Sequence, residues 1–361
     1  MKSLIFMIVL IFSFTTLAVV DAATATVKPV KKISKKGKMS KDTISKRNSA
    51  PSRSGGMFDF TRARDRSYND LMLLPKSMTF WGETSFEHTS DGYDQADNNG
   101  KEFLNVDMPK NMFIQKARFG ISESFGVGLD LAYGSLSAEL TQPVNNNKTT
   151  KMKFSGLADP VFNGKFRLLH QKDMPVELDF IAAISPSFGK AKYPKIAANG
   201  DTNGKGTIAR GGTNFELGAE VGQRFTNFQW KAGPKLEICG SQKKKSPETT
   251  WKFESRTDFT VHGDAQFRFS DLFLLNSHLA LIFEGEEVKK QGDANKITTE
   301  GGTNLQLSVD GLFNFIPEKL GVGLTLVKTF MGDREVKQAD DKSDSINKGS
   351  FMWGLFGRYQ F

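Results

Sequence analysis

GSFMWGLFGRYQF, residues 349 to 361, ends the chain with a dense run of large apolar side chains. Alternate side chains of a strand share one face, and here one face would carry Phe351, Trp353, Leu355, Tyr359 and Phe361. The other face would carry Gly354, Arg358 and Gln360, and only Phe356 breaks the alternation. Ordinary chain ends tend to fray. The stretch therefore predicts a terminal strand that its surroundings hold in place.

Composition argues against a helical membrane protein. The chain has 361 residues, of which 25% are charged, and a mean hydropathy of -0.38. Beyond the N-terminus, no run of apolar residues reaches the roughly 18 to 20 that a spanning helix needs. We therefore predict no transmembrane helix.

Residues 1 to 22 have the pattern of a signal peptide. Lys2 supplies the positive charge, residues 4 to 20 are apolar, and Val20-Asp21-Ala22 precedes the expected cleavage. A non-cleaved anchor is the alternative. Cys239 is the only cysteine, so an intramolecular disulfide is impossible, and the absence of a cysteine near the cleavage site argues against a lipoprotein.

Residues 23 to 56 form a basic tail. They contain ten Lys or Arg against one acid, Asp42, and too few apolar residues to build a core, so we expect disorder on the periplasmic side. An anionic envelope polymer or a lipid headgroup is the expected partner of such a charge, and a merely solvated tail is the alternative. An exported protein seldom meets nucleic acid, which we exclude as a partner.

After a pre-barrel segment, residues 57 to 76, alternating patterns follow one another through residues 77 to 361. We predict about twelve strands, near residues 77–88, 111–122, 125–137, 160–170, 175–188, 213–225, 227–239, 256–269, 277–287, 303–316, 320–331 and 349–361. Five connectors are short: 122–124, 170–174, 226–227, 270–276 and 317–319. The other six are long and polar, among them 89–110, 138–159, 189–212 and 332–348. Strict alternation of long and short connectors indicates an up-and-down meander.

The two faces of these strands differ sharply. Residues 215 to 224 place Phe, Leu, Ala and Val on one face and Glu, Gly and Arg on the other, and the strands near residues 176 and 305 repeat the pattern. A lipocalin-like barrel with an apolar interior would fit any one strand. The even number of long strands, the export signal and the aromatic C-terminus together favour an all-β, transmembrane, antiparallel up-and-down β-barrel, which satisfies every backbone group by closure.

The polar faces predict the side chains that line the interior of this barrel. They are Glu83, Lys116, Arg118, Asp130, Lys165, Arg167, Glu177, Asp179, Glu216, Glu220, Arg224, Lys231, Lys235, Glu237, Asp264, Arg268, Asp310 and Arg358. A wall with both signs of charge could be a solvated pore, or it could close into salt bridges.

The last strand resembles the final strand of bacterial outer-membrane barrels. In such proteins a terminal Phe with alternating apolar residues is an assembly signal, and the resemblance assigns this role to Trp353, Leu355, Tyr359 and Phe361. It implies the barrel-assembly machinery, outer-membrane lipid and lipopolysaccharide as partners. Closure against the first strand would place both termini in the periplasm and the long connectors outside the cell.

Three short motifs carry a narrower resemblance. Gly156-Leu157-Ala158-Asp159-Pro160 opens one expected strand, Pro186-Ser187-Phe188-Gly189 ends the next, and Gly211-Gly212-Thr213-Asn214 starts another. The pattern resembles that of the outer-membrane transporters named after the MetA pathway of phenol degradation, over roughly residues 125 to 360. That family usually has Gly where Ala158 stands. The resemblance implies a transport role and carries over no binding residue.

The sequence gives little support for a catalytic site or a metal site. The four histidines, at positions 88, 170, 262 and 278, fall at strand ends, in turns or on the lumen side, and no Ser–His pair on the outer face is evident. Residues 201 to 206 begin like a calcium loop, but Lys205 stands at a ligand position, so we expect a flexible surface loop. We predict no enzyme, no cofactor and no metal.

Two functions remain. A twelve-stranded barrel is wider than an eight-stranded one, which its own side chains fill, and narrower than the open sixteen-stranded porins, so it could enclose a narrow aqueous path. We expect a channel or transporter that passes small solutes through a charged lumen. The alternative is a non-conducting structural or adhesin-like barrel that displays its long loops.

Overall fold

A computed structural model describes residues 77–97, 100–143, 148–171, 173–188, 191–192, 194–196, 202–245, 250–291, 295–316, 319–338 and 341–360. The predicted signal peptide, basic tail and pre-barrel segment lie outside these residues, as does Phe361. No helix in the described part of the chain is long and apolar enough to cross a membrane.

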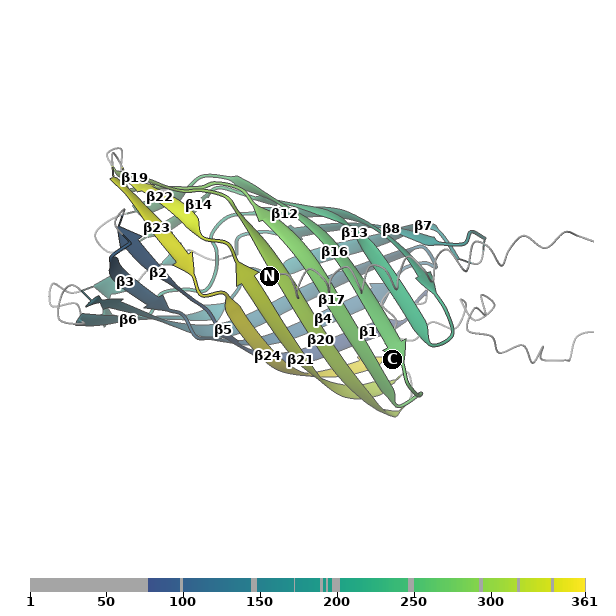
Figure 1. Ribbon diagram of the computed structural model, residues 1–361. Helices are drawn as coiled ribbons and strands as arrows, with labels where there is room; N and C mark the ends of the chain where they lie inside the picture. The colour runs from purple at the N-terminus through teal and green to yellow at the C-terminus, as the bar shows by residue number, and fades with distance from the viewer. Residues whose placement is uncertain are drawn as a thin grey trace, which may run out of the picture. The chain divides into compact units, whose positions relative to one another are not determined.

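Twelve long strands form a closed antiparallel barrel, which confirms the predicted fold class (Figure 1). They are β1 (Phe80–Ser90), β4 (Lys110–Gly120), β5 (Phe125–Gln142), β7 (Val161–Leu169), β8 (Glu177–Ser185), β12 (Asn214–Arg224), β13 (Phe228–Cys239), β16 (Arg256–Arg268), β17 (Phe273–Glu284), β20 (Gly302–Ile316), β21 (Leu320–Met331) and β24 (Ser350–Gln360). Each pairs with the next along the chain, as an up-and-down meander requires.

The C-terminal strand closes the barrel. β24 pairs with β21 on one side and with β1 on the other, in a register that runs from Trp81 opposite Gln360 to Ser90 opposite Phe351. Closure leaves no unpaired strand edge, which a membrane would penalise because lipid offers no hydrogen bonds. The predicted pairing of the first and last strands is confirmed.

Further strands extend the wall beyond these twelve, where the sequence analysis predicted loops. They are β2 (Gly92–Asp97), β3 (Glu102–Asp107), β6 (Lys148–Leu157), β9 (Ala191–Lys192), β14 (Gln242–Lys245), β15 (Thr250–Phe253), β18 (Glu287–Gln291), β19 (Asn295–Thr299), β22 (Arg334–Gln338) and β23 (Asp341–Asn347). Neighbouring hairpins pair with one another, as β2 does with β23 and β15 with β18. A separate pair, β10 (Lys195–Ile196) and β11 (Thr202–Asn203), lies within the connector 189–212.

One predicted boundary was wrong. The sequence analysis placed a short connector over residues 270 to 276, but β17 begins at Phe273. Asn276 is a buried residue of this strand, and its side chain accepts a hydrogen bond from Gln266 at 2.6 Å. A polar residue that faces the lumen therefore resembled a loop residue.

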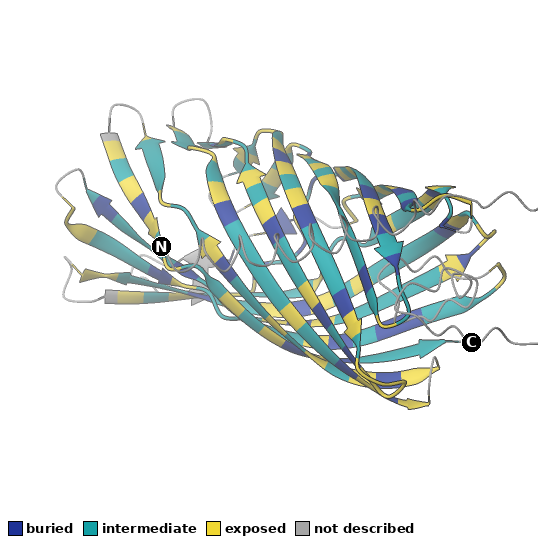
Figure 2. Cartoon of the chain, turned by 45° about the vertical axis from the view of Figure 1, so that its right-hand side comes forward, coloured by how far each residue is buried: buried dark blue, intermediate teal, exposed yellow. Residues whose placement is uncertain are grey.

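Burial is reversed relative to a water-soluble protein (Figure 2). Along β12, Phe215 and Leu217 are exposed on the outside, whereas the alternate residues Asn214 and Glu220 are buried. In Figure 2 the strands carry exposed, intermediate and buried bands along their length. Apolar side chains outside and polar ones inside are the arrangement of a barrel that crosses a membrane.

Candidate functional site in the barrel interior

A cavity of about 480 Å³ lies inside the barrel. Ten of the predicted lumen residues line it: Arg118, Asp130, Lys165, Glu216, Glu220, Lys231, Lys235, Asp264, Asp310 and Arg358. The uncharged or aromatic side chains of Trp81, Asn163, Gln266 and Asn276 also line it. The long strands therefore bring together in one space charged groups that are up to 240 positions apart in the sequence, from Arg118 to Arg358.

Most of the remaining predicted residues take part in ion pairs. Glu83, Lys116, Arg167, Glu177, Asp179, Arg224 and Glu237 each contact an oppositely charged side chain. Arg268, the last residue of β16, is half-buried and lies at the short-turn end of its strand. The cavity wall is thus mixed in charge, and most of its charged side chains already contact an opposite charge.

The most buried ion pairs join β7 and β8. Arg167 binds Asp179 through Nε at 2.6 Å and a second nitrogen at 2.8 Å, and it contacts Glu177 at 2.8 Å. Arg224 of β12 holds the same Glu177 at 2.6 Å. Arginine suits this position because its planar fork binds a carboxylate through two parallel hydrogen bonds. These contacts fix the register of three strands on the inside.

A second network continues around the wall from Glu220. This carboxylate contacts Lys231 at 2.9 Å, Lys165 at 3.6 Å and His262 at 2.9 Å. The next carboxylate, Asp264, lies 2.7 Å from His278. Because a buried charge is costly unless it is paired and hydrogen-bonded, such a network can exist only with its partners in place.

The opposite wall carries its own pairs. Glu83 contacts Lys116 at 2.8 Å and Arg358 at 2.5 Å, which links β4, β1 and β24 across the closing seam. Arg118 pairs with Asp130 between β4 and β5, and its guanidinium lies 5.8 Å from the ring centre of Trp81. Ion pairs therefore support the barrel from within on both sides of the cavity.

The short-turn end of the lumen is filled by a set of buried side chains that we call the basal ring. It consists of Glu83, Arg167, Glu177, Arg224, Gln229, Gln266, Leu274, Leu312 and Phe356. Each is at most 9% exposed. The five short turns all lie at this end, because consecutive long strands run in opposite directions.

Part of the basal ring is apolar. Leu274, Leu312 and Phe356 form one buried cluster inside the barrel. Phe356 was the exception to the alternation in the last strand, and here it lies on the inner face. A Cβ atom at Gly323 of the neighbouring β21 would lie 2.2 Å from the Phe356 ring, so only glycine leaves room for it.

The rest of the ring is polar. Its residues Gln229 and Gln266 form a hydrogen-bonded row with the neighbouring Asn276 across β13, β16 and β17. The side chain of Gln171, in the turn after β7, exchanges two hydrogen bonds of 2.7 Å with the backbone of Arg224. Polar and apolar side chains are thus both buried at this end.

Sequence reasoning missed several of these residues. Trp81, Gln266, Leu274 and Leu312 were not selected, because only charged residues were taken as lumen-lining. The signal was present, since Trp81 stands two positions before Glu83 and Gln266 two positions after Asp264. Extending the period of two to uncharged residues would have found them.

The three motifs of the sequence resemblance meet at Asp159. Its carboxylate accepts hydrogen bonds from the backbone nitrogens of Phe188 at 3.1 Å, Arg210 at 2.7 Å and Gly211 at 3.4 Å. Gly211 has a φ of +85°, which favours glycine. One carboxylate thus ties both ends of the connector 189–212 to the start of β7.

One histidine contact refines the sequence analysis. Ser124 Oγ lies 2.8 Å from His170 Nε2, so the structure does contain a Ser–His pair. Both residues stand in short turns outside the long strands, and the pair links the β4–β5 turn to the β7–β8 turn. It is therefore not a pair on the outer face at mid-membrane level.

The described residues of the expected assembly signal, Trp353, Leu355 and Tyr359, lie on the outer face. Trp353 and Leu355 are exposed there, and the Tyr359 hydroxyl lies 2.5 Å from Gln115 Nε2. The Tyr359 ring covers Gly82 of β1, where a Cβ atom would lie 2.4 Å from it. Aromatic packing over a glycine strengthens the closing seam.

Comparison with known proteins identifies the fold. No family profile matches the chain, and no curated protein does. An outer membrane channel from Pseudomonas putida F1 aligns over 82% of this chain and 100% of its own, with 11% identity and a TM-score of 0.50. The translocator domain of the autotransporter NalP from Neisseria meningitidis gives 12% identity, coverages of 84% and 99%, and a TM-score of 0.44. A FadL homologue from Pseudomonas aeruginosa gives 9% identity, coverages of 84% of this chain and 95% of its own, and a TM-score of 0.38.

The fold and the comparison agree. A closed barrel with an apolar outside and a polar inside is the arrangement of a β-barrel that crosses a membrane. The chain therefore has the fold of a twelve-stranded antiparallel β-barrel, similar to that of the outer membrane channel.

Proposed function

We propose that this barrel is a channel that passes small polar solutes through its charged lumen. The observation that carries the proposal is the cavity of about 480 Å³ inside the barrel, with both signs of charge on its wall. Since small-molecule sites commonly measure about 300 to 1,000 Å³, a small solute fits this space. Because charges of both signs are paired along the wall, the lumen should favour neutral or zwitterionic solutes over simple cations or anions.

In this proposal the basal ring closes the resting channel. Its apolar part, Leu274, Leu312 and Phe356, forms a buried cluster on the inner face beside the short turns. Hydrophobic constrictions block ions and water by dewetting. Passage therefore requires these side chains to move, and smaller side chains should ease it.

A planar lipid bilayer tests the proposal with the purified full chain. We expect rare discrete current steps from the unchanged protein and frequent ones from Phe356→Ala. Lys235→Glu should shift ion selectivity toward cations, because Lys235 lines the cavity. Lys151→Glu is the matched control, since Lys151 makes the same charge change on a hairpin where its side chain is 58% exposed.

The second candidate is a non-conducting barrel that displays its hairpins. The basal ring and the hairpin strands beyond the membrane wall favour it. If neither the unchanged chain nor Phe356→Ala conducts, and neither admits small solutes into liposomes, this candidate replaces the channel. Neither role is enzymatic, and we propose no catalytic residue.

Topology and partners form part of the proposal. We place both termini in the periplasm and the hairpins outside, in contact with lipopolysaccharide, so that tags near Asn146, Asn203 or Asp341 should be reached by antibody on intact cells. Labelling only after lysis contradicts this orientation. Trp353, Leu355, Tyr359 and Phe361 would engage the barrel-assembly machinery, and residues 23 to 56 an anionic envelope polymer.

A further inference from the structure

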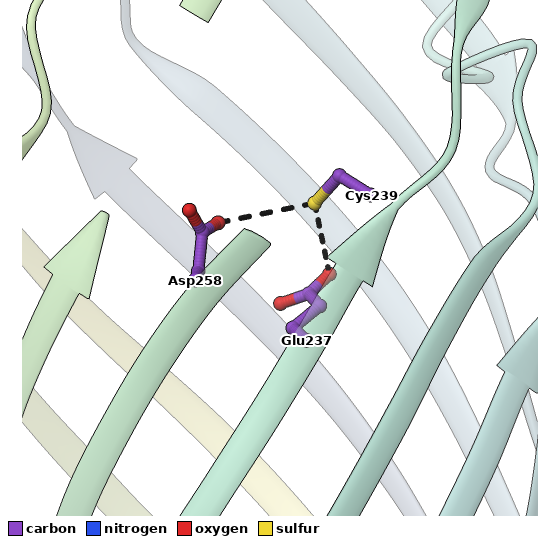
Figure 3. Close-up of side chains that lie close together, drawn as sticks. All are labelled: Glu237, Cys239 and Asp258. Carbon is purple, nitrogen blue, oxygen red and sulfur yellow. Dashed lines mark hydrogen bonds between the residues drawn. The ribbon is translucent and has the colours of Figure 1, made fainter. Parts of the chain in front are cut away.

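Three potential metal ligands meet at the long-hairpin end of the lumen (Figure 3). Glu237 and Cys239 stand two positions apart on β13, so their side chains share the inner face, and Asp258 lies opposite Glu237 on β16. Cys239 Sγ is 3.6 Å from Glu237 Oε1 and 3.8 Å from Asp258 Oδ2. Each of the three offers one ligand atom, and all lie within 4.8 Å of one another.

These separations suit a tetrahedral metal ion. A zinc ion with Zn–S of about 2.3 Å and Zn–O of about 2.0 Å holds sulfur and oxygen about 3.5 Å apart at the tetrahedral angle. The two sulfur–oxygen distances here are close to that value. An ion could therefore enter the cluster with only small movements of the side chains.

A buried amide beside the cluster supplies the independent observation. Asn214 of β12 lies opposite Cys239, is 5% exposed, and its amide nitrogen is 3.4 Å from Glu237 Oε1. Its oxygen has no hydrogen-bond partner among the described residues. A rotation of the amide plane by 180° exchanges the two atoms and turns the oxygen toward Glu237. A cation would satisfy this oxygen as a fourth ligand.

Two arginines currently balance the charge of the cluster. Arg256 contacts Asp258 Oδ2 at 3.1 Å, but it also contacts Glu287 at 3.4 Å, so it has a second carboxylate to hold when it leaves Asp258. Arg210 contacts Glu237 at 3.3 Å, and its side chain is 59% exposed. Both guanidinium groups can therefore give way to an ion, and both compete with it.

We propose that Glu237, Cys239 and Asp258, with Asn214, form a binding site for a divalent cation of the zinc class at the mouth of the lumen. Binding replaces the S–H bond of Cys239 by a metal–sulfur bond and releases one proton to water. A thiolate ligand selects zinc or cadmium over magnesium or calcium, which prefer oxygen alone. The site goes beyond the channel proposal and does not depend on conduction.

Binding of zinc to the purified full chain in detergent micelles, measured by titration calorimetry, tests the site. Cadmium should in addition produce the ultraviolet charge-transfer band of a cadmium–thiolate bond. We expect one equivalent to bind, with the affinity at least tenfold weaker in Cys239→Ser and in Asp258→Asn. Asp310→Asn is the control, because it removes a cavity carboxylate on β20, outside the cluster, and it should leave the affinity unchanged.

Arg256→Gln separates a metal site from a structural cluster. It removes a competing positive charge, so zinc should bind more tightly, whereas a purely structural ion pair would give no such gain. The cadmium band of the unchanged chain needs no variant and so does not depend on mutant folding. Absence of the band, equal zinc affinity in Cys239→Ser, or weaker binding in Arg256→Gln would each overturn the proposal.

Discussion

Arg167 lies at the centre of the ion pairs inside the barrel, and its replacement by glutamine should destabilise the fold. The guanidinium is fully buried and serves both Asp179 and Glu177. Arg167→Gln removes its charge but leaves the two buried carboxylates. Removing one member of a buried ion pair costs about 3 to 5 kcal/mol, because the other charge stays behind without compensation.

The structure places the expected loss at the low end of that range. Asp179 keeps Lys165 at 2.9 Å, and Glu177 keeps Arg224 at 2.6 Å. We therefore expect a loss of about 3 kcal/mol in the free energy of unfolding, which is on the order of a hundredfold in the equilibrium constant. Urea unfolding in lipid vesicles, followed by tryptophan fluorescence, measures this difference.

Lys151→Gln provides the matched control. Lys151 contacts Glu139 at 2.7 Å, but the side chains are 58% and 37% exposed. An exposed pair contributes only about 0 to 1 kcal/mol, because water and salt screen it. Equal losses in the free energy of unfolding for Arg167→Gln and Lys151→Gln would show that the interior network does not stabilise the barrel.

Three further predictions concern the seam, the tethered connector and the outer face. Gly82→Ala should move the Tyr359 ring and destabilise the folded barrel, as measured on heat-modifiability gels, because the atoms nearest to the new Cβ all belong to the Tyr359 side chain. For the same reason, Tyr359→Ala in the same chain should restore the stability. Asp159→Ala should leave three amides without their acceptor and speed limited proteolysis within residues 189–212, and unchanged cleavage would rule out the tether. Leu217→Lys should lower the free energy of unfolding by roughly 2 to 4 kcal/mol if the residue lies at the bilayer midplane. The control Leu217→Phe should not lower it. A lysine that leaves the stability unchanged would argue against lipid contact at this position.

The distribution of side chains between inside and outside was predictable because it is local. Alternation has a period of two, so Leu217 and Glu220 could be assigned to opposite faces from their spacing alone. The even number of strands and the aromatic end then required a closed barrel with its last strand against its first. Pairing of β24 with β1 follows from closure and not from any signal within β1.

The partners of the inner charges could not be predicted. Arg167 and Asp179 lie 12 positions apart, and their contact depends on the exact register of β7 against β8, which a slip of one residue would abolish. The hairpin strands were missed for another reason. Segments such as 242–245, Gln-Lys-Lys-Lys, are polar on both faces and therefore show no alternation. Their strands form by pairing with neighbouring hairpins.

If a water-filled, charged lumen lies inside a membrane-spanning barrel, Lys235 should be reached by water and Leu236 should be covered by lipid. The most direct measurement compares the two positions. These neighbours on β13 point to opposite faces, with exposed fractions of 33% and 37%. Each is replaced by cysteine in a Cys239→Ser background, and the protein in lipid vesicles is treated with a charged, water-soluble thiol reagent. We expect rapid labelling of Lys235→Cys and almost none of Leu236→Cys. Equal labelling of the two, or preferential labelling of Leu236→Cys, would contradict this expectation.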